Sequence, residues 1–440
     1  MVDQERLELS TSPSVAVRSI QLKLLVHNFL LIIVYQHLVY FNNKFNLDFM
    51  FNSLNEVVIV SALRTPIGTL NGSLKDIKAD ILGSIIIKEI LRKVKCDKEK
   101  IDQVIMGQVL TAGNGQNPAR QASINAGMPF STPAYIVNQV CGSGLRAVVS
   151  GFQSIKLGES KYVIAGGQEN MSASQHSILF RNKKKVLIEE LKDTMIIDGL
   201  LDAFNNYHMG VTAENVAKKF KITREKQDKF ALGSQQKTQI AIKENKFDNE
   251  LVKIEQNNAY LAKDEHPRNG LNIDDLKKLR TVFLKNGTVT PGNSSGINDG
   301  AAALLLTTLE EAKKKLIKPL AKIVSWSSVG VDPSLMGLGP IEAVKDAIKK
   351  AEWKLNEIDL FEINEAFAAQ SIAVIRELNI DKNKVNVNGG AIALGHPIGA
   401  SGARILVTLI HEMIKQKKNR GCATLCIGGG MGIALCVERI

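Results

Sequence analysis

The amino-acid sequence predicts an α/β protein made of two similar halves with a long insertion between them. From residue 56 onward, strand-like and helix-like segments alternate along the chain. The alternation stops over residues 174–296, where polar and charged loops and helices take over, and then resumes. Alternating strands and helices are typical of sheets covered by helices. We therefore expect a mostly parallel sheet.

The first half shows the alternation most clearly. Four β-branched or continuously apolar runs predict strands: "VVIVSALR", "IDQVIMGQVL", "PAYIV" and "YVIAGGQEN". Between them, "DILGSIIIKEILRKV" and "LRAVVSGFQSIKLG" carry apolar residues at helical spacing, which predicts helices. The resulting order is βαββαβ, which we interpret as a βαβαβ domain with one additional strand.

The second half repeats this organisation. We expect strands in "AAALLLTT", "LAKIVSWSSVGVDP", "IDLFEI" and "GCATLCIGGGMGIALCVERI", and helices in "PIEAVKDAIKKAEW", "NEAFAAQSIAVIREL" and "GARILVTLIHEMIKQ". "YVIAGGQEN" closes the first half as "TLCIGGGMG" nearly closes the second, and "NQVCGSGLRAV" corresponds to "INEAFAAQSIAV" as a strand that runs into a helix. We infer a duplicated α/β domain with an inserted loop domain.

Length and composition fit a multidomain enzyme. With 440 residues, 45% of them hydrophobic, the chain is long enough for two or three domains with their own cores. The net charge is +12, but the basic runs are scattered, so we interpret them as solvated faces, an anionic ligand being the alternative. No zinc-finger spacing or aromatic-basic interleaving indicates nucleic-acid binding.

Cysteines and glycines exclude several other classes. Five widely spaced cysteines form no disulfide framework and suit a reducing compartment. Cys422 and Cys426 have no further ligands nearby, so no metal site is expected. The glycine strings do not give a dinucleotide fingerprint after a first strand, and no GxSxG elbow or Walker lysine motif is present. An NAD-dependent oxidoreductase is therefore disfavoured.

Residues 1–54 do not join the pattern. The apolar run from Leu24 to Phe41 is interrupted by polar side chains, which argues against a membrane span. Early acids and the lack of arginine enrichment argue against a mitochondrial transit peptide. We expect a poorly ordered upstream extension, of the kind that gene modelling adds, with a membrane-associating segment as the alternative.

The first candidate for chemistry is Cys141, which lies between a predicted strand end and a predicted helix start. The helix dipole and the free N–H groups of the first turn favour a thiolate there. Gly142 and Gly144 remove side-chain bulk beside the sulfur, so that a ligand can approach. Taken alone, however, such a cysteine is more often a packed structural residue.

Three further candidates lie in the second half. His396 stands in a glycine-rich loop, and histidine is the side chain best suited to proton transfer near neutral pH. Cys426 ends a strand before three glycines whose N–H groups are able to hold an oxyanion. Asn364 lies at a strand-to-helix turn, where helix capping is the simpler interpretation.

Together these motifs resemble the thiolase family over essentially all of residues 55–440. "NQVCGSGLRAV", "YHMGVTAENVA", "NSSGINDGAAA", "INEAFAA", "GGAIALGHPIGASGAR" and "CIGGGMG" match thiolase motifs in order. "TVTPGNSSGINDG" and "IVSWSSVGVDPSLMG" are most similar to the cytosolic thiolases that act on acetoacetyl-CoA. Gln168 and Ser294 stand where the family usually has Met and Ala, and neither is expected to touch the chemistry.

The resemblance implies a thiolase fold, in which duplicated βαβαβ domains form a layered α/β/α/β/α core with an inserted loop domain. The extension at residues 1–54 would precede an N-terminal domain at 55–173, completed by about 297–318. A CoA-binding loop domain would span 174–296, and the C-terminal domain 319–440.

It also implies acetyl-CoA C-acetyltransferase activity: condensation of two acetyl-CoA to acetoacetyl-CoA and CoA, and the reverse thiolysis, through an acetyl-cysteine. Cys141 would be the acylated nucleophile, His396 the base that activates it, and Cys426 the second acid/base. Asn364 would hold a water that forms one oxyanion hole with His396. The backbone N–H groups of Cys141 and Gly428 would form the other.

The resemblance further assigns the substrate contacts and partners. Coenzyme A would contact Arg268 and Ser295, with Leu200, His208, Phe283 and Phe367 nearby, and the acyl pocket would be lined by Met209 and Met336. No metal or other cofactor is expected, because CoA thioesters are the substrates. We expect a homotetramer in the cytoplasm, or alternatively in the mitochondrion, with no nucleic-acid partner and no stable membrane insertion.

Three rival classes share part of this pattern. A decarboxylating condensing enzyme of the ketoacyl synthase type would not need Cys426. A broad-range degradative thiolase would accept long 3-ketoacyl-CoA chains. A non-catalytic lipid-binding relative would lack a catalytic residue, and none is missing from this sequence.

Overall fold

The computed structural model describes residues 56–181, 185, 187–256 and 259–440. The chain divides into Met1–Asn55 and Glu56–Ile440, so the extension predicted at residues 1–54 lies outside the described residues. Within the part described, no helix has the length and apolar character needed to cross a membrane.

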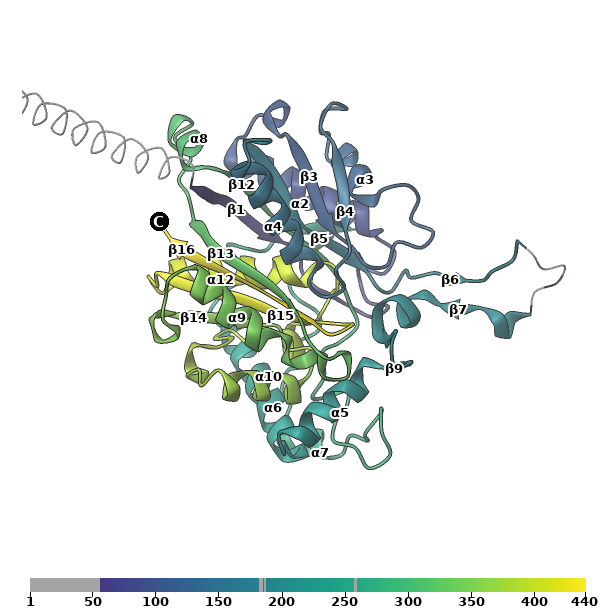
Figure 1. Ribbon diagram of the computed structural model, residues 1–440. Helices are drawn as coiled ribbons and strands as arrows, with labels where there is room; N and C mark the ends of the chain where they lie inside the picture. Colours follow the sequence, from purple (N-terminus) through teal and green to yellow (C-terminus); the bar gives the residue numbers. More distant parts are fainter. Residues whose placement is uncertain (1–55, 182–184, 186, 257–258) are drawn as a thin grey trace, which may run out of the picture. The chain divides into compact units, whose positions relative to one another are not determined.

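A ten-stranded sheet runs through residues 56–440 (Figure 1). Its order is β14-β15-β16-β13-β1-β12-β5-β3-β4, and the short β2 pairs with β12. In chain order the strands are β1 (Val57–Arg64), β2 (Gly68–Thr69), β3 (Gln103–Gly107), β4 (Ala134–Val137), β5 (Tyr162–Asn170), β12 (Asn298–Thr308), β13 (Ala321–Gly330), β14 (Leu360–Ile363), β15 (Arg420–Ile427) and β16 (Met431–Arg439).

This sheet is mixed, so the expectation of a mostly parallel sheet is wrong. Among the described strands, only the pairs β3–β4, β3–β5 and β14–β15 are parallel. The pairs of β1 with β12 and β13, of β12 with β5, and of β16 with β13 and β15 are antiparallel. β15 and β16 are joined by residues 428–430 alone, and so short a turn permits only an antiparallel pair.

The two halves of the sheet have the same strand order. In space the first half runs β4, β3, β5, β12, β1, and the second runs from a bridge at Val385 through β14, β15, β16 and β13. Both orders correspond to chain ranks 3-2-4-5-1. The duplication is therefore real, and β5 corresponds to β15 as predicted. The helix before β5 corresponds to the helix before β15, however, and so the predicted match of "NQVCGSGLRAV" with "INEAFAAQSIAV" is wrong.

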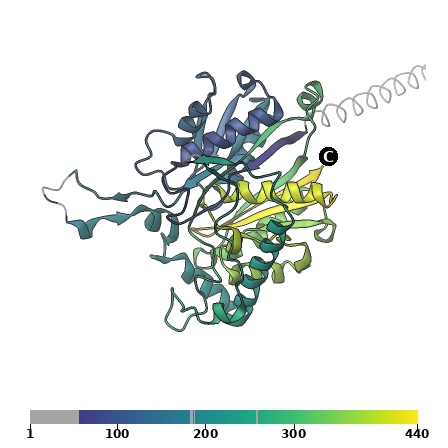
Figure 2. The ribbon, with the colours of Figure 1, turned by 180° about the vertical axis from the view of Figure 1, so that it is seen from behind.

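Helices and sheet halves form five layers, as predicted. One apolar core joins both sheet halves to the central helices α4 (Ser143–Lys156) and α12 (Ser401–Lys415). The outer face of the first half is covered by α2 (Ala79–Val94) and α3 (Pro118–Asn125), and that of the second by α9 (Gly339–Lys350) and α10 (Ala368–Glu377). Successive side chains of β12 point to opposite faces of the sheet, and accordingly Leu304 packs in the central core and Leu305 in the outer core. Figure 2 shows α12 (yellow) beside the yellow strands.

The described residues of 174–296 add no strand to the large sheet. Helices α5 and α6 of this region pack on α10 (Figure 1). Its elements are β6 (His176–Ser177), β7 (Lys192–Asp193), β8 (Leu201–Asp202), β9 (Tyr207–His208), α5 (Met209–Lys219), α6 (Arg224–Lys243), β10 (Ile254–Gln256), β11 (Ala259–Leu261) and α7 (Ile273–Lys277). The domain boundaries given above stay predictions.

Short helices complete the description. Two are single turns of α-helix, α8 (Leu309–Lys314) and α11 (Ala391–Leu394). The others are tighter or wider turns, η1 (Lys98–Lys100), η2 (Ile188–Glu190), η3 (Met195–Leu200), η4 (Pro333–Leu338), η5 (Leu355–Glu357) and η6 (Lys382–Lys384).

Candidate active site

The two central helices cross at their N-terminal ends, and glycines permit the crossing. A Cβ on Gly144 of α4 would lie 2.8 Å from the backbone N of Ala403 in α12, and one on Gly402 would overlap the backbone N of Leu145. Any larger residue would hold the helices apart. The crossing brings together the segments that precede the two helices.

Gly142 and Gly144 allow close packing within the protein. The prediction that they let a ligand approach the Cys141 sulfur is therefore wrong. The space beside Gly144 is filled by the backbone of Gly399 and Ala403, and a Cβ on Gly142 would overlap the Ile427 side chain. Cys141 is consequently 4% exposed.

Cys141 and His396 meet at this crossing. The Sγ atom of Cys141 lies 3.4 Å from Nε2 of His396. Nδ1 of His396 lies 2.5 Å from Oγ of Ser401, and the Ser401 hydroxyl donates to the carbonyl oxygen of Pro397 at 2.8 Å. Because Ser401 has one proton, it accepts from Nδ1–H. This assigns the proton to Nδ1 and leaves Nε2 as a base facing the sulfur.

The loop that carries His396 is fixed at both ends. The backbone N–H of His396 donates to Oδ1 of Asn298 at 2.9 Å, and Nδ2 of Asn298 donates to the carbonyl oxygen of Gly68 at 2.9 Å. Beyond the histidine, the N–H of Gly399 donates to Glu169 at 2.9 Å. Buried groups held in this way keep the imidazole in one orientation.

A strained turn presents the cysteine. Val140, immediately before it, has φ 46°, which is rare for a β-branched residue. The turn is closed by Ser143, whose hydroxyl donates to the carbonyl oxygen of Val140 at 2.6 Å and accepts the N–H of Gln139 at 2.8 Å. Strain of this kind persists where the surroundings fix it, typically at functional sites.

Burial sets the protonation of the pair. Loss of solvation raises the pKa of Cys141 to about 11, and the backbone N–H groups of Gly428 and Cys141, which point at the sulfur, offset only part of this. Burial and the charge of Arg404 lower the pKa of His396 to about 3. Burial thus opposes the thiolate that the helix dipole favours, and it opposes a charged imidazole as well.

Cys426 is the last residue but one of β15 and is fully buried. It packs in a cluster with Met209, Met336 and Phe367. Its pKa is raised far above the ordinary value, first by burial and then by the nearby Cys141. Leu200 packs against this cluster and also against the cluster that contains Cys141, so the two cysteines lie in neighbouring clusters.

Asn364 follows β14, whose neighbour is β15. Its backbone N–H donates to the carbonyl oxygen of Thr424 at 3.0 Å. Its side chain is fully buried, and neither the amide nitrogen nor the amide oxygen has a partner. The following helix begins at Ala368 without a side-chain cap, so the capping interpretation of Asn364 is wrong. A buried free amide of this kind is suited to hold a water or a substrate oxygen.

A cavity of about 410 Å³ opens onto His396. Six of the predicted CoA contacts line it: Leu200, His208, Arg268, Phe283, Ser295 and Phe367. The His208 ring stacks on Phe283 with centroids 4.5 Å apart. Its Nδ1 accepts the Gly210 N–H at 3.0 Å. Cys141, Cys426, Asn364, Gly428, Met209 and Met336 do not line the cavity.

Several residues of the site were not predicted. Ser401 and Asn298 lie in quoted motifs, and the spacing of Ser401 one helical turn after Pro397 is the only signal for it. Met171 and Ile398 pack with Cys141, which the sequence did not indicate. Ser294, taken to be remote from the chemistry, lines the cavity, with its hydroxyl donated to the carbonyl oxygen of Thr290 at 2.8 Å.

The arrangement offers a nucleophilic thiol with a base, a second thiol, backbone N–H groups at the first sulfur and a free amide. These are the groups that acyl transfer requires. Among the described residues, no cluster of His, Cys, Asp or Glu is arranged to hold a metal ion.

Two family models match the chain. The model described as "Thiolase, N-terminal domain" covers residues 57–310, and "Thiolase, C-terminal domain" covers residues 317–439. The cytosolic acetyl-CoA acetyltransferase of Rattus norvegicus is 52% identical over 389 residues, 87% of this chain and 98% of the relative. The acetyl-CoA acetyltransferase of Cupriavidus necator is 52% identical over 392 residues, 88% of this chain and 100% of the relative.

Solved structures agree with the sequence matches. The crystal structure of the Bacillus anthracis acetyl-CoA acetyltransferase has a TM-score of 0.86 at 42% identity, covering 88% of this chain and 100% of the other. That of human mitochondrial 3-ketoacyl-CoA thiolase in complex with CoA has a TM-score of 0.85 at 41% identity, covering 88% and 99%. Matches of this length and identity share both the fold and the motifs, and on these grounds the chain belongs to the thiolase family.

Proposed function

We propose that this chain is an acetyl-CoA C-acetyltransferase, which condenses two acetyl-CoA to acetoacetyl-CoA and CoA and catalyses the reverse thiolysis. The contact of 3.4 Å between Cys141 Sγ and His396 Nε2, with Cys426 nearby, carries the proposal. The names of the relatives at 52% identity support the choice of substrate.

In the first half-reaction, His396 Nε2 takes the Cys141 proton as the sulfur attacks the carbonyl carbon of acetyl-CoA. The C–S bond to Cys141 forms, the C–S bond to CoA breaks, and the CoA sulfur leaves with the proton from His396. Because the resting thiol has a raised pKa, proton transfer and attack are coupled. The N–H groups of Cys141 and Gly428 hold the oxyanion.

In the second half-reaction, the Cys426 thiol gives its proton to His396, and the thiolate so formed removes a methyl proton from a second acetyl-CoA. The resulting carbanion attacks the acetyl carbon on Cys141, the new C–C bond forms, and the Cys141 sulfur leaves with the proton from His396. A water held by the free amide of Asn364 would stabilise the enolate oxygen together with His396. Thiolysis runs the same steps backwards.

The cavity suits a coenzyme A thioester. Arg268 supplies a cation, while the stacked pair His208 and Phe283 supplies an apolar wall. Met209 and Met336, packed against Cys426, would bound a small acyl pocket. No metal or other cofactor would take part, because the thioester itself activates the carbonyl.

The cellular setting is proposed from the relatives and the family resemblance. The cytosolic relative favours the cytoplasm, with the mitochondrion as the alternative. Assembly as a homotetramer rests on the family resemblance.

An assay tests the proposal against its rivals. Purified protein should form acetoacetyl-CoA from acetyl-CoA alone, and a malonyl thioester should not increase the rate. Thiolysis of 3-ketoacyl-CoA should fall steeply beyond four carbons. Dependence on the malonyl thioester would indicate a decarboxylating condensing enzyme, and equal activity on long chains a degradative thiolase.

A further inference from the structure

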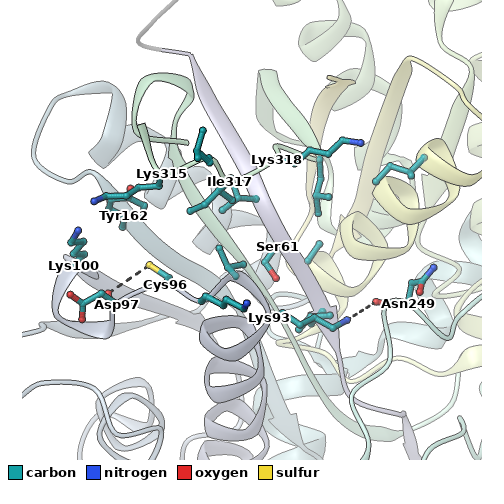
Figure 3. A pocket seen from close by; sticks show the side chains of 18 of the residues that line it. Ser61, Lys93, Cys96, Asp97, Lys100, Tyr162, Asn249, Lys315, Ile317 and Lys318 are labelled. Atoms are coloured by element: carbon teal, nitrogen blue, oxygen red, sulfur yellow. Dashed lines mark hydrogen bonds between the residues drawn. The ribbon is translucent and has the colours of Figure 1, made fainter. Parts of the chain in front are cut away.

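A second cavity, of about 840 Å³, shares no lining residue with the active-site cavity (Figure 3). It lies between β1, the end of α2, the segment after α8 and the end of α12. No step of the proposed mechanism uses it.

The wall of this cavity is strongly basic. Five lysines line it, and they are Lys93, Lys95, Lys100, Lys315 and Lys318. Among the described lining residues Asp97 is the only acid. Lys93 is occupied, since its Nζ donates to the carbonyl oxygen of Asn249 at 3.1 Å. No described carboxylate forms an ion pair with any of the five.

Two of these lysines face each other. Figure 3 shows the side chains of Lys100 and Lys315 ending side by side near Tyr162, at the end of the cavity opposite the Lys93–Asn249 hydrogen bond. Their contact and mutual charge lower the pKa of Lys315. Both ammonium groups are exposed, so solvent screens much of their mutual repulsion, and an anion between them would relieve what remains.

The rest of the wall is apolar. Val94, Ile317, Leu320 and Ile414 lie along the cavity, and Ile414 is 39% exposed. A cavity with cations at one end and an apolar wall favours a ligand with an anionic head and a short apolar body.

We propose that this lysine cavity, defined by Lys100, Lys315, Ile317 and Leu320, binds a small amphipathic phosphate. The phosphate head would lie between Lys100 and Lys315, and the apolar body along Ile317 and Leu320. The proposal stands independently of the function proposed for the active site.

Cys96 provides a local reporter. It lines the cavity and is the one cysteine of the five that is not buried. Burial and then Asp97 raise the pKa of Cys96, and the charges of Lys100 and Lys315 offset part of this. A bound phosphate would cover the sulfur and cancel the lysine charges, and both effects reduce the reactive thiolate.

The test measures alkylation of Cys96 by iodoacetamide in the full-length protein, residue by residue, by mass spectrometry. Saturating hexyl phosphate should slow it by about tenfold, and hexanol at the same concentration should not. The double variant Lys100→Ala, Lys315→Ala should lose this protection. The matched double variant Lys345→Ala, Lys349→Ala, which removes the same charge from α9, should keep it.

Cys141 serves as an internal comparison in the same digest. If hexyl phosphate protects Cys141 but leaves Cys96 unaffected, the anion occupies only the active site, and the proposal is overturned. Equal protection of Cys96 in the Lys100, Lys315 double variant also overturns it, because the lysine pair would then not hold the head. Protection by inorganic phosphate equal to that by hexyl phosphate would reject the apolar subsite.

Discussion

Nδ1 of His396 lies 2.5 Å from Oγ of Ser401, and the single proton of Ser401 is donated to Pro397. This pair leaves Nε2 free to act as a base toward Cys141. Among the described residues no carboxylate contacts the imidazole, so little stabilises its cationic form, in agreement with the lowered pKa of His396.

Replacing Ser401 with Ala should therefore remove the acceptor that keeps the His396 proton on Nδ1, so that the tautomer with its proton on Nε2 becomes populated. We expect acylation of Cys141 to slow by about 10- to 100-fold, measured by rapid quench and mass spectrometry. The control is Ser325→Ala, which removes a buried hydroxyl that donates to the carbonyl oxygen of Ala347 at 2.6 Å, far from the site. If both variants lose activity equally, Ser401 acts only through stability.

The pH dependence of Cys141 alkylation should reveal a resting thiol. With the pKa raised to about 11, the thiolate fraction increases as pH rises, so the rate should climb about tenfold per pH unit between roughly pH 7 and 10. With the pKa of His396 lowered to about 3, no histidine step should appear near pH 6.5. A plateau that begins near pH 6 would instead indicate a preformed thiolate–imidazolium pair.

Asn364→Ala separates catalysis from stability. Because the Asn364 amide has no partner among the described protein atoms, its removal breaks no hydrogen bond within the protein, and the urea midpoint should not fall. Condensation should nevertheless slow by about 10²-fold or more. The matched variant Asn386→Ala should unfold at lower urea, since that side chain is bonded to Ile363 and Glu365. A destabilised but active Asn364 variant would contradict the assignment.

Cys426→Ser separates the roles of the two sulfurs. The serine hydroxyl is a far weaker acid than the thiol, so C–C bond formation should fall by about 10²-fold or more. Acetylation of Cys141 should continue, because Cys141 and His396 are untouched. The two rates are measured on one preparation, by enolate absorbance and by mass. Condensation near the wild-type rate would make Cys426 structural.

Local patterns predicted the strands and helices, and the resemblance to the thiolase family implied the layers and the candidate site residues. Alternating apolar runs located the strands, and the glycine-rich loops around Cys141, His396 and Cys426 marked segments that meet at the candidate site. Six of the predicted CoA contacts, which come from separate motifs along the chain, line one cavity.

Other features depend on long-range pairing, which no local pattern reports. Whether β12 pairs with β1 or with a parallel neighbour is decided by the return of the chain after residue 296, and the sheet is mixed for that reason. The match of α4 with α12 depends on strand order. Met171 and Ile398 pack with Cys141, whose burial raises its pKa, and both residues lie far from the cysteine in the sequence.

The central claim is that Cys141 carries the acyl group, and trapping tests it most directly. The protein is incubated briefly with acetoacetyl-CoA, quenched in denaturant, digested and analysed by mass spectrometry. We predict one acetyl group on Cys141, which the Cys141→Ala variant lacks while its other four cysteines stay unmodified. A dominant acetyl adduct on Cys426 or Cys96, or turnover by the Cys141→Ala protein, would contradict the account.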